Sequence, residues 1–222
     1  MKILSLFDGM SCGRIALERA GIKVEKYYAS EIDKYAIEIS KKNYPDIEHV
    51  GDVCLLDAKD FKDIDIIIAG SPCTGFSFAG KQLAFDDPQS KLFFEFTRLL
   101  KAIKPKYFLL ENVRMKAEYE DIISEQISKI YPEFSNHQDL FTKKIKPYSI
   151  NSSLLSAQSR ERLYWTNIQN IELPKDKGIV LKDILETDVK DEFLAGENLQ
   201  KNYEGGNQLN PNYKSQANSI HD

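Results

Sequence analysis

The chain has 222 residues, 42% of them hydrophobic, and a formal net charge of −4, so it can bury a sizeable core but lacks an overall positive charge that would indicate nucleic-acid binding. The three cysteines lack CxxC spacing and are too few for a disulfide framework, which favours a reducing compartment. The three histidines are far apart, so no metal site is recognisable in the sequence. No signal peptide and no apolar run near the ~18 residues of a membrane span are present, so we expect a cytoplasmic protein without a membrane partner.

The first 130 residues alternate short apolar strands with amphipathic helices. The pattern predicts strands over residues 3–7, 24–30, 47–53, 64–69 and 107–110, and helices over 12–20, 34–43, 92–103 and 116–130. This alternation is typical of the α/β class, with a parallel, doubly wound sheet and helices on both faces. Shorter strand-like segments follow over 141–150 and 162–168, and the polar residues 196–222 are predicted to be loop or disordered tail.

A glycine turn joins the first strand to the first helix. Gly9 allows the backbone to turn tightly and approach a ligand, and Gly13 allows close packing of helix on strand. The N-terminus of the following helix favours an anionic group. The turn is not the GxGxxG dinucleotide fingerprint, and a glycine turn alone is weak evidence.

Two acidic residues lie where the second and third predicted strands end. Glu31 comes 22 residues after Gly9, where an acid accepts hydrogen bonds from ribose hydroxyls in such folds. Asp52 is placed to accept a hydrogen bond from an adenine amino group. Together these residues indicate an adenosine-bearing cofactor, although each acid taken alone is also an ordinary polar residue at a strand end.

Pro72 and Cys73 follow the strongly apolar strand 64–69. A thiol at the carboxyl end of such a strand is exposed on a rigid support, as a nucleophile requires. The alternative is that Cys73 fills space in the core. The long segment 74–89 is predicted to be a lid, or else an ordinary disordered loop.

Glu111 follows another buried strand, where a partly desolvated carboxylate suits proton donation or sharing. A helix cap or a salt bridge is the alternative. Arg160 and Arg162 are two residues apart, so in an extended segment both side chains point to one side and suit a phosphate or a carbonyl oxygen. A surface charge cluster is the alternative for this pair.

In this order the motifs resemble those of the cytosine carbon-5 DNA methyltransferase family. The matching features are the Phe-x-Gly turn, the acidic strand ends, Pro-Cys, Glu-Asn-Val and Gln-x-Arg-x-Arg, which together span residues 3 to about 168. The amino-acid sequences of residues 4–9 and 92–96 are also similar to those of the compact de novo branch and of solitary phage and bacterial enzymes. The resemblance implies a class I S-adenosylmethionine-dependent methyltransferase fold. It also implies that the protein acts in the cytoplasm of a bacterial or phage-infected cell.

The resemblance implies S-adenosylmethionine as the cofactor. Phe7 would contact the adenine, Gly9 would lie in the methionine-binding turn, Glu31 would bind the ribose and Asp52 the adenine amino group. The remaining residues of the predicted cofactor site are Asp8, Ile32, Val53 and Pro72.

The resemblance further implies that a cytosine is flipped out of double-stranded DNA into the site. The Cys73 thiolate would attack carbon 6, and Glu111 would hold the ring nitrogen and the exocyclic amine. Arg162 would bind the ring carbonyl and Arg160 would support the site. Carbon 5 would then take the methyl group.

Residues 1–168 are therefore predicted to be the catalytic domain, and 169–222 a partial target-recognition region with a polar tail. The two further motifs that end the family's sequences are not seen, which indicates a truncation, a split-enzyme subunit or a degenerate copy, with a complementing C-terminal segment or subunit as partner. The alternative functions are a tRNA cytosine-5 methyltransferase, a non-catalytic DNA-binding paralogue and, least favoured, a nicotinamide-dependent oxidoreductase.

Overall fold

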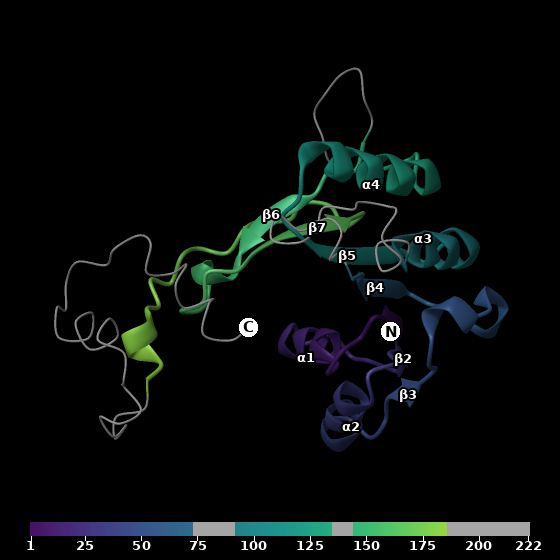
Figure 1. Ribbon diagram of the computed structural model, residues 1–222, viewed down its shortest axis with the longest axis horizontal. Coiled ribbons are helices and arrows are strands. Elements are labelled where there is room, and N and C mark those ends of the chain that lie inside the picture. The colour runs from purple at the N-terminus through teal and green to yellow at the C-terminus, as the bar shows by residue number, and fades with distance from the viewer. Residues whose placement is uncertain (73–91, 135–143, 186–222) are drawn as a thin grey trace. The chain divides into compact units, whose positions relative to one another are not determined.

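The computed structural model describes residues 1–72, 92–134 and 144–185. These residues form a seven-stranded sheet in the order β3-β2-β1-β4-β5-β7-β6 (Figure 1). The strands are β1 (Lys2–Leu6), β2 (Lys26–Ser30), β3 (Glu48–His49), β4 (Ile66–Gly70), β5 (Tyr107–Val113), β6 (Tyr148–Asn151) and β7 (Glu161–Thr166). The helices are α1 (Cys12–Arg19), α2 (Lys34–Asn43), α3 (Leu92–Ile103) and α4 (Ala117–Ile130).

Strands β3, β2, β1, β4 and β5 are parallel, and β7 runs antiparallel to β5. From β1 the chain adds β2 and β3 on one side and then returns to add β4 on the other. Ligands of open α/β sheets bind at such a reversal, outside the carboxyl ends of the strands. The α/β prediction is confirmed, and the topology directs attention to the carboxyl ends of β1 and β4.

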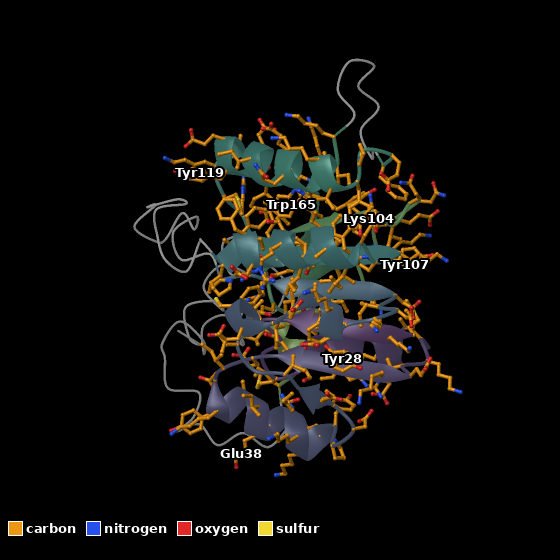
Figure 2. All side chains as sticks on the ribbon, turned by 90° about the vertical axis from the view of Figure 1, so that its right-hand side faces the viewer. Tyr28, Glu38, Lys104, Tyr107, Tyr119 and Trp165 are labelled. Atoms are coloured by element: carbon orange, nitrogen blue, oxygen red, sulfur yellow. The ribbon has the colours of Figure 1, made fainter. Side chains whose placement is uncertain are left out.

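Alternate residues of β1 pack on opposite faces of the sheet. Leu4 and Leu6 belong to the larger buried cluster, which includes apolar residues of α3 and α4, whereas Ile3 packs in a second cluster with Leu17 of α1. Trp165 of β7 lies beneath α4 (Figure 2), where its indole nitrogen donates a hydrogen bond to Ser124 at 2.9 Å. Helices therefore cover both faces, as the sequence predicts.

Helix α1 packs closely on the sheet because Gly13 has no side chain. A Cβ atom at this position would lie 3.0 Å from the hydroxyl oxygen of Tyr27. Such a contact is tighter than ordinary packing allows, so the close approach predicted for Gly13 is confirmed.

Two predicted strands differ from those observed. The predicted strand 47–53 is wrong over most of its length, since β3 contains only Glu48 and His49. Gly51 adopts a φ of +80°, and the Asp52 side chain then caps a 3-10 turn, Val53–Leu55. Strand β5 continues to Val113 rather than ending at residue 110, so Glu111 lies within a strand.

The chain divides into two compact units, residues 1–149 with 162–171, and residues 150–161 with 172–222. In the second unit, the side-chain oxygen of Asn151 accepts hydrogen bonds from the backbone amides of Ser153 and Arg160, each at 3.0 Å. Within the described residues, none of the helices combines the length and the apolar character that crossing a membrane requires.

Candidate active site

The carboxylate of Glu111 lies beside the end of β4. Glu111 is the register partner of Gly70 across the parallel β4–β5 pair. A Cβ added to Gly70 would lie 3.5 Å from one carboxylate oxygen of Glu111. The acid is thus held next to the strand end that leads directly to Ser71 and Pro72.

Arg162 forms an ion pair with Glu111, with 2.9 Å between its Nε and the carboxylate. The antiparallel register explains the pair, because Arg162 lies opposite Val113, two residues along β5 from Glu111 and on the same face. The Arg162 side chain is 17% exposed and that of Glu111 is 36% exposed. The structure therefore brings together two predicted site residues that lie 51 positions apart in the sequence. The pair leaves part of the Glu111 carboxylate open to solvent.

Asn112 ties β5 to the chain that leaves β4. Its side-chain nitrogen donates to the hydroxyl of Ser71 at 3.3 Å, and its side-chain oxygen accepts from the backbone amide of Val113 at 2.8 Å. Both Asn112 and Ser71 are buried. Neither residue has a role of its own among the predictions from sequence, where their positions next to Glu111 and Pro72 were the only available signal.

Pro72 is partly exposed at the end of this described stretch. Cys73 and the predicted lid, residues 74–89, lie outside the described residues. The proposed meeting of the Cys73 sulfur with the Glu111 carboxylate therefore stays a prediction.

The turn after β1 has an unusual backbone. Phe7, Gly9 and Ser11 all have positive φ values, of 57°, 58° and 65°. Left-handed conformations cost energy in residues with a side chain, and they concentrate at functional sites. Apart from its chain neighbours, no atom of the described residues lies within 4 Å of the position that a Gly9 Cβ would occupy, so this part of the turn faces open space among those residues.

Glu31 holds this turn through its carboxylate. One oxygen accepts from the Gly9 amide at 2.7 Å, and the other accepts from the amides of Ile32 and Asp33 at 2.8 and 2.9 Å. A carboxylate has about four acceptor positions. Among the described hydrogen bonds three positions are used, which leaves one for a ligand hydroxyl.

The Asp8 carboxylate points into the protein. One of its oxygens accepts from the Tyr27 hydroxyl at 2.7 Å and the other from the Ser11 hydroxyl. Burial and the neighbouring Asp8 raise the pKa of Tyr27 far above its ordinary value, so the phenol stays a donor. The Ser11 hydroxyl lies against Asp8 and Ser40, and it makes no hydrogen bond that caps α1. Asp8 therefore shapes the turn from inside, and its assignment to the cofactor site stays a prediction.

The remaining predicted cofactor residues differ in their exposure. Ile32 is 75% exposed, whereas Val53 is buried in the larger core cluster. Asp52 is partly exposed, and one of its oxygens accepts from the Cys54 amide at 2.9 Å. Phe7 is partly buried and packs against the larger cluster.

Two cysteines lie within the described residues, Cys12 and Cys54, and both are exposed free thiols. Desolvation and the nearby Asp52 carboxylate raise the pKa of the Cys54 thiol, which disfavours the nucleophilic thiolate. Within the described part of the chain no group of three His, Cys, Asp or Glu residues is arranged to hold a metal ion.

Arg160 belongs to the second compact unit and is described there. Its side chain is exposed, and its backbone carbonyl accepts from the Ser152 amide at 3.1 Å. It immediately precedes β7, whereas Arg162 lies within that strand.

A sequence model of C-5 cytosine-specific DNA methylases matches residues 1–221. The chain is 33% identical over 209 residues to the type II methyltransferase M.HhaI of Haemophilus parahaemolyticus, which covers 88% of this chain and 60% of that protein. It is also 33% identical over 214 residues to M1.ScrFI of Lactococcus lactis subsp. cremoris, covering 89% of this chain and 52% of that protein. The chain thus spans about half to three fifths of the length of these relatives.

Solved structures show the same fold. A prophage-encoded candidate DNA modification methyltransferase of Escherichia coli superposes with a TM-score of 0.60 at 28% identity, over 79% of this chain and 51% of that one. The Dnmt2 methyltransferase of S. pombe superposes with a TM-score of 0.63 at 22% identity, over 92% of this chain and 67% of that one.

Proposed function

Because the chain belongs to the C-5 cytosine-specific DNA methylase family, we propose that it transfers a methyl group from S-adenosylmethionine to carbon 5 of a cytosine in double-stranded DNA. The single observation that carries this proposal is the Glu111–Arg162 pair, held beside Gly70 at the end of the strand that leads to Pro72 and Cys73. A carboxylate and a guanidinium side by side supply the acceptor and donors that a cytosine edge requires.

The glycine turn supports the assignment of the cofactor. Open space at Gly9 admits a ligand close to the backbone, and the N-terminus of α1, uncapped by Ser11, favours a carboxylate. The open acceptor position of Glu31 suits a ribose hydroxyl, and Asp52 suits an adenine amine. When bound, S-adenosylmethionine supplies an electrophilic methyl group.

The proposed chemistry at the base uses residues of this chain. The Cys73 thiolate forms a bond to carbon 6, while Glu111 stabilises the charge that develops on the ring and Arg162 binds the ring carbonyl. Arg160 supports the site. After carbon 5 has accepted the methyl group, the carbon 5 proton leaves to solvent, and the carbon–sulfur bond breaks to restore the ring double bond and the thiolate.

We further propose that these residues act together with additional polypeptide, in the same chain or in a second one. The relatives' greater length supports this idea. Residues 1–168 would supply the catalytic domain and 169–222 part of the target-recognition region. The bacterial relatives support action on DNA in the cytoplasm of a bacterial or phage-infected cell.

The test is transfer of labelled methyl groups to duplex DNA and to tRNA, measured with the complete polypeptide that contains these residues. We expect labelled 5-methylcytosine in the duplex, abolished by Cys73→Ser while cofactor binding persists. A duplex carrying 5-fluorocytosine should form a covalent adduct at Cys73. Labelling of tRNA alone would reject DNA as the substrate, and absence of the adduct would reject the covalent route.

A further inference from the structure

The guanidinium of Arg98 on α3 clamps the chain segment that follows Asp52. Its two terminal nitrogens donate to the backbone carbonyls of Leu56 at 3.0 Å and Val53 at 3.2 Å. Its third nitrogen, Nε, donates to the carboxylate of Glu95 at 2.7 Å, one turn earlier on the same helix. The planar fork thus fixes two carbonyls three residues apart, which the point charge of a lysine cannot do.

The clamped segment is a short turn closed by hydrogen bonds of its own, among them one at 3.3 Å from the Leu56 amide to the Val53 carbonyl. The Asp52 side chain and backbone carbonyl accept from the amides of Cys54 and Leu55, at 2.9 and 3.0 Å. Val53 and Leu56 are buried, whereas Leu55 is 83% exposed. Two apolar side chains therefore anchor the turn, and the Arg98 clamp connects its backbone to a helix.

The Arg98 side chain is 41% exposed, so packing in the core does not explain its placement. An exposed arginine loses rotamer freedom when it is held, and exposed ion pairs add little stability. Three simultaneous hydrogen bonds specify one orientation of the guanidinium. The clamp links the Asp52 turn to helix α3. In the sequence, α3 is the helix that follows the segment carrying Cys73.

We propose that Arg98, oriented by Glu95, is a positioning residue that holds Asp52 in place for the adenosine of the cofactor. This inference rests on the proposed function, since it assigns Arg98 to the same cofactor site. Arg98 does not contact the cofactor in this proposal. It acts through the backbone of residues 52–56.

The first test needs no cofactor. Hydrogen exchange of the Cys54, Leu55 and Leu56 amides is followed by NMR in the wild-type chain, Arg98→Met and a control, Lys129→Met. The control breaks a comparable pair on α4, where Lys129 lies 2.9 Å from Glu125. We expect exchange in the turn to accelerate about tenfold in Arg98→Met and to change less than about twofold in the control. Unchanged exchange in Arg98→Met overturns the inference.

The second test measures S-adenosylmethionine binding by calorimetry in a double-mutant cycle of Arg98→Met with Asp52→Ala. We expect Arg98→Met to weaken binding about five- to tenfold when Asp52 is present and less than about twofold when it is absent, because the two residues act as one unit. Equal weakening in both backgrounds would overturn the inference.

The conservative variant Arg98→Lys separates positioning from charge. It keeps the positive charge and loses the fork, so its binding is expected to resemble that of Arg98→Met rather than wild type. Wild-type binding by Arg98→Lys would count against the clamp. The binding measurements use the complete polypeptide that contains these residues. Should that polypeptide bind no S-adenosylmethionine, the proposed function fails, and the exchange experiment alone then decides whether Arg98 holds the turn.

Discussion

The side-chain amide of Asn112 donates to the hydroxyl of Ser71. Ser71 lies two residues before Cys73, so this bond joins β5 to the chain segment that leaves β4. Asn112 is 1% exposed and Ser71 is 3% exposed, so water does not compete for the bond. The neighbouring residue on β5 is Glu111. One strand therefore presents the candidate acid and also fixes the direction in which the Pro72 backbone departs.

Asn112→Ala should reduce both stability and catalysis. The substitution leaves the Val113 amide and the Ser71 hydroxyl without their partner, which costs about 1–3 kcal/mol of unfolding free energy. If Asn112 also orients the segment before Cys73, the methyl-transfer rate falls while cofactor affinity changes little. Urea unfolding, calorimetry and a transfer assay measure the three quantities.

Asn167→Ala is the matched control for this experiment. Asn167 is a buried asparagine that follows β7, and its side chain lies beside the amino end of β5. There its side-chain oxygen accepts from the Phe108 amide at 3.1 Å, and its side-chain nitrogen donates to the Lys106 carbonyl at 2.9 Å. We expect a similar loss of stability with an unchanged transfer rate at a temperature where both variants are folded. Equal rate losses in the two variants would reduce Asn112 to a structural role.

Glu111→Gln should separate catalysis from stability. The Glu111–Arg162 pair is partly exposed, so its loss is expected to change the unfolding free energy by less than about 1 kcal/mol. Losing the carboxylate should lower methyl transfer by about a hundredfold or more, as expected for a group that exchanges protons or charge with the substrate. Glu125→Gln breaks an exposed pair on α4 and should leave transfer unchanged. A Glu111→Gln enzyme with near wild-type rates would remove Glu111 from the mechanism.

The elements that were predicted well are those with a local signal. Helix α2 matches its predicted bounds because Asp33 caps it and an apolar pattern runs through it. Glu111 and Arg162 were recognised by their motifs, and their pairing then follows from the strand register. The Asn112–Ser71 bond joins residues 41 positions apart, so no local pattern could reveal it. In the same way, one buried partner of Asp8 is Tyr27, which lies on β2, 19 positions away.

Gly9→Ala should weaken S-adenosylmethionine binding beyond what its loss of folding stability explains. The residue has a φ of +58°, so an alanine there costs roughly 1–2 kcal/mol through its backbone, but within the described part of the chain its Cβ meets no atom within 4 Å other than those of its chain neighbours. A ligand close to the backbone would clash with that Cβ. Gly21→Ala is the control, because Gly21 has a φ of +70° with equally open space but follows the other end of α1. Calorimetry should show weaker S-adenosylmethionine binding in Gly9→Ala alone, and equal affinities would reject the assignment of the turn.

His49 should make folding stability dependent on pH below neutrality. Its Nε2 lies 3.3 Å from the Ser40 hydroxyl, which contacts the Ser11 hydroxyl at 2.6 Å. Burial, and then the charge of Lys41, lower the pKa of His49 below its ordinary value of 6.5, against the opposing effect of the Asp8 carboxylate. The unfolded chain consequently binds the proton more readily than the folded one.

The sign of the effect follows from this difference in proton binding. Stability is fully present above the unfolded pKa of about 6.5, and it falls as the pH drops through the lower folded pKa, by roughly 1.4 kcal/mol for each unit between the two values. His49→Gln removes this contribution, so urea unfolding from pH 8 to pH 5 should show a shallower loss of stability in the variant. Lys41→Met should also make the loss shallower, because it removes a charge that lowers the pKa. Parallel pH profiles for wild type and His49→Gln would show that His49 does not carry the dependence.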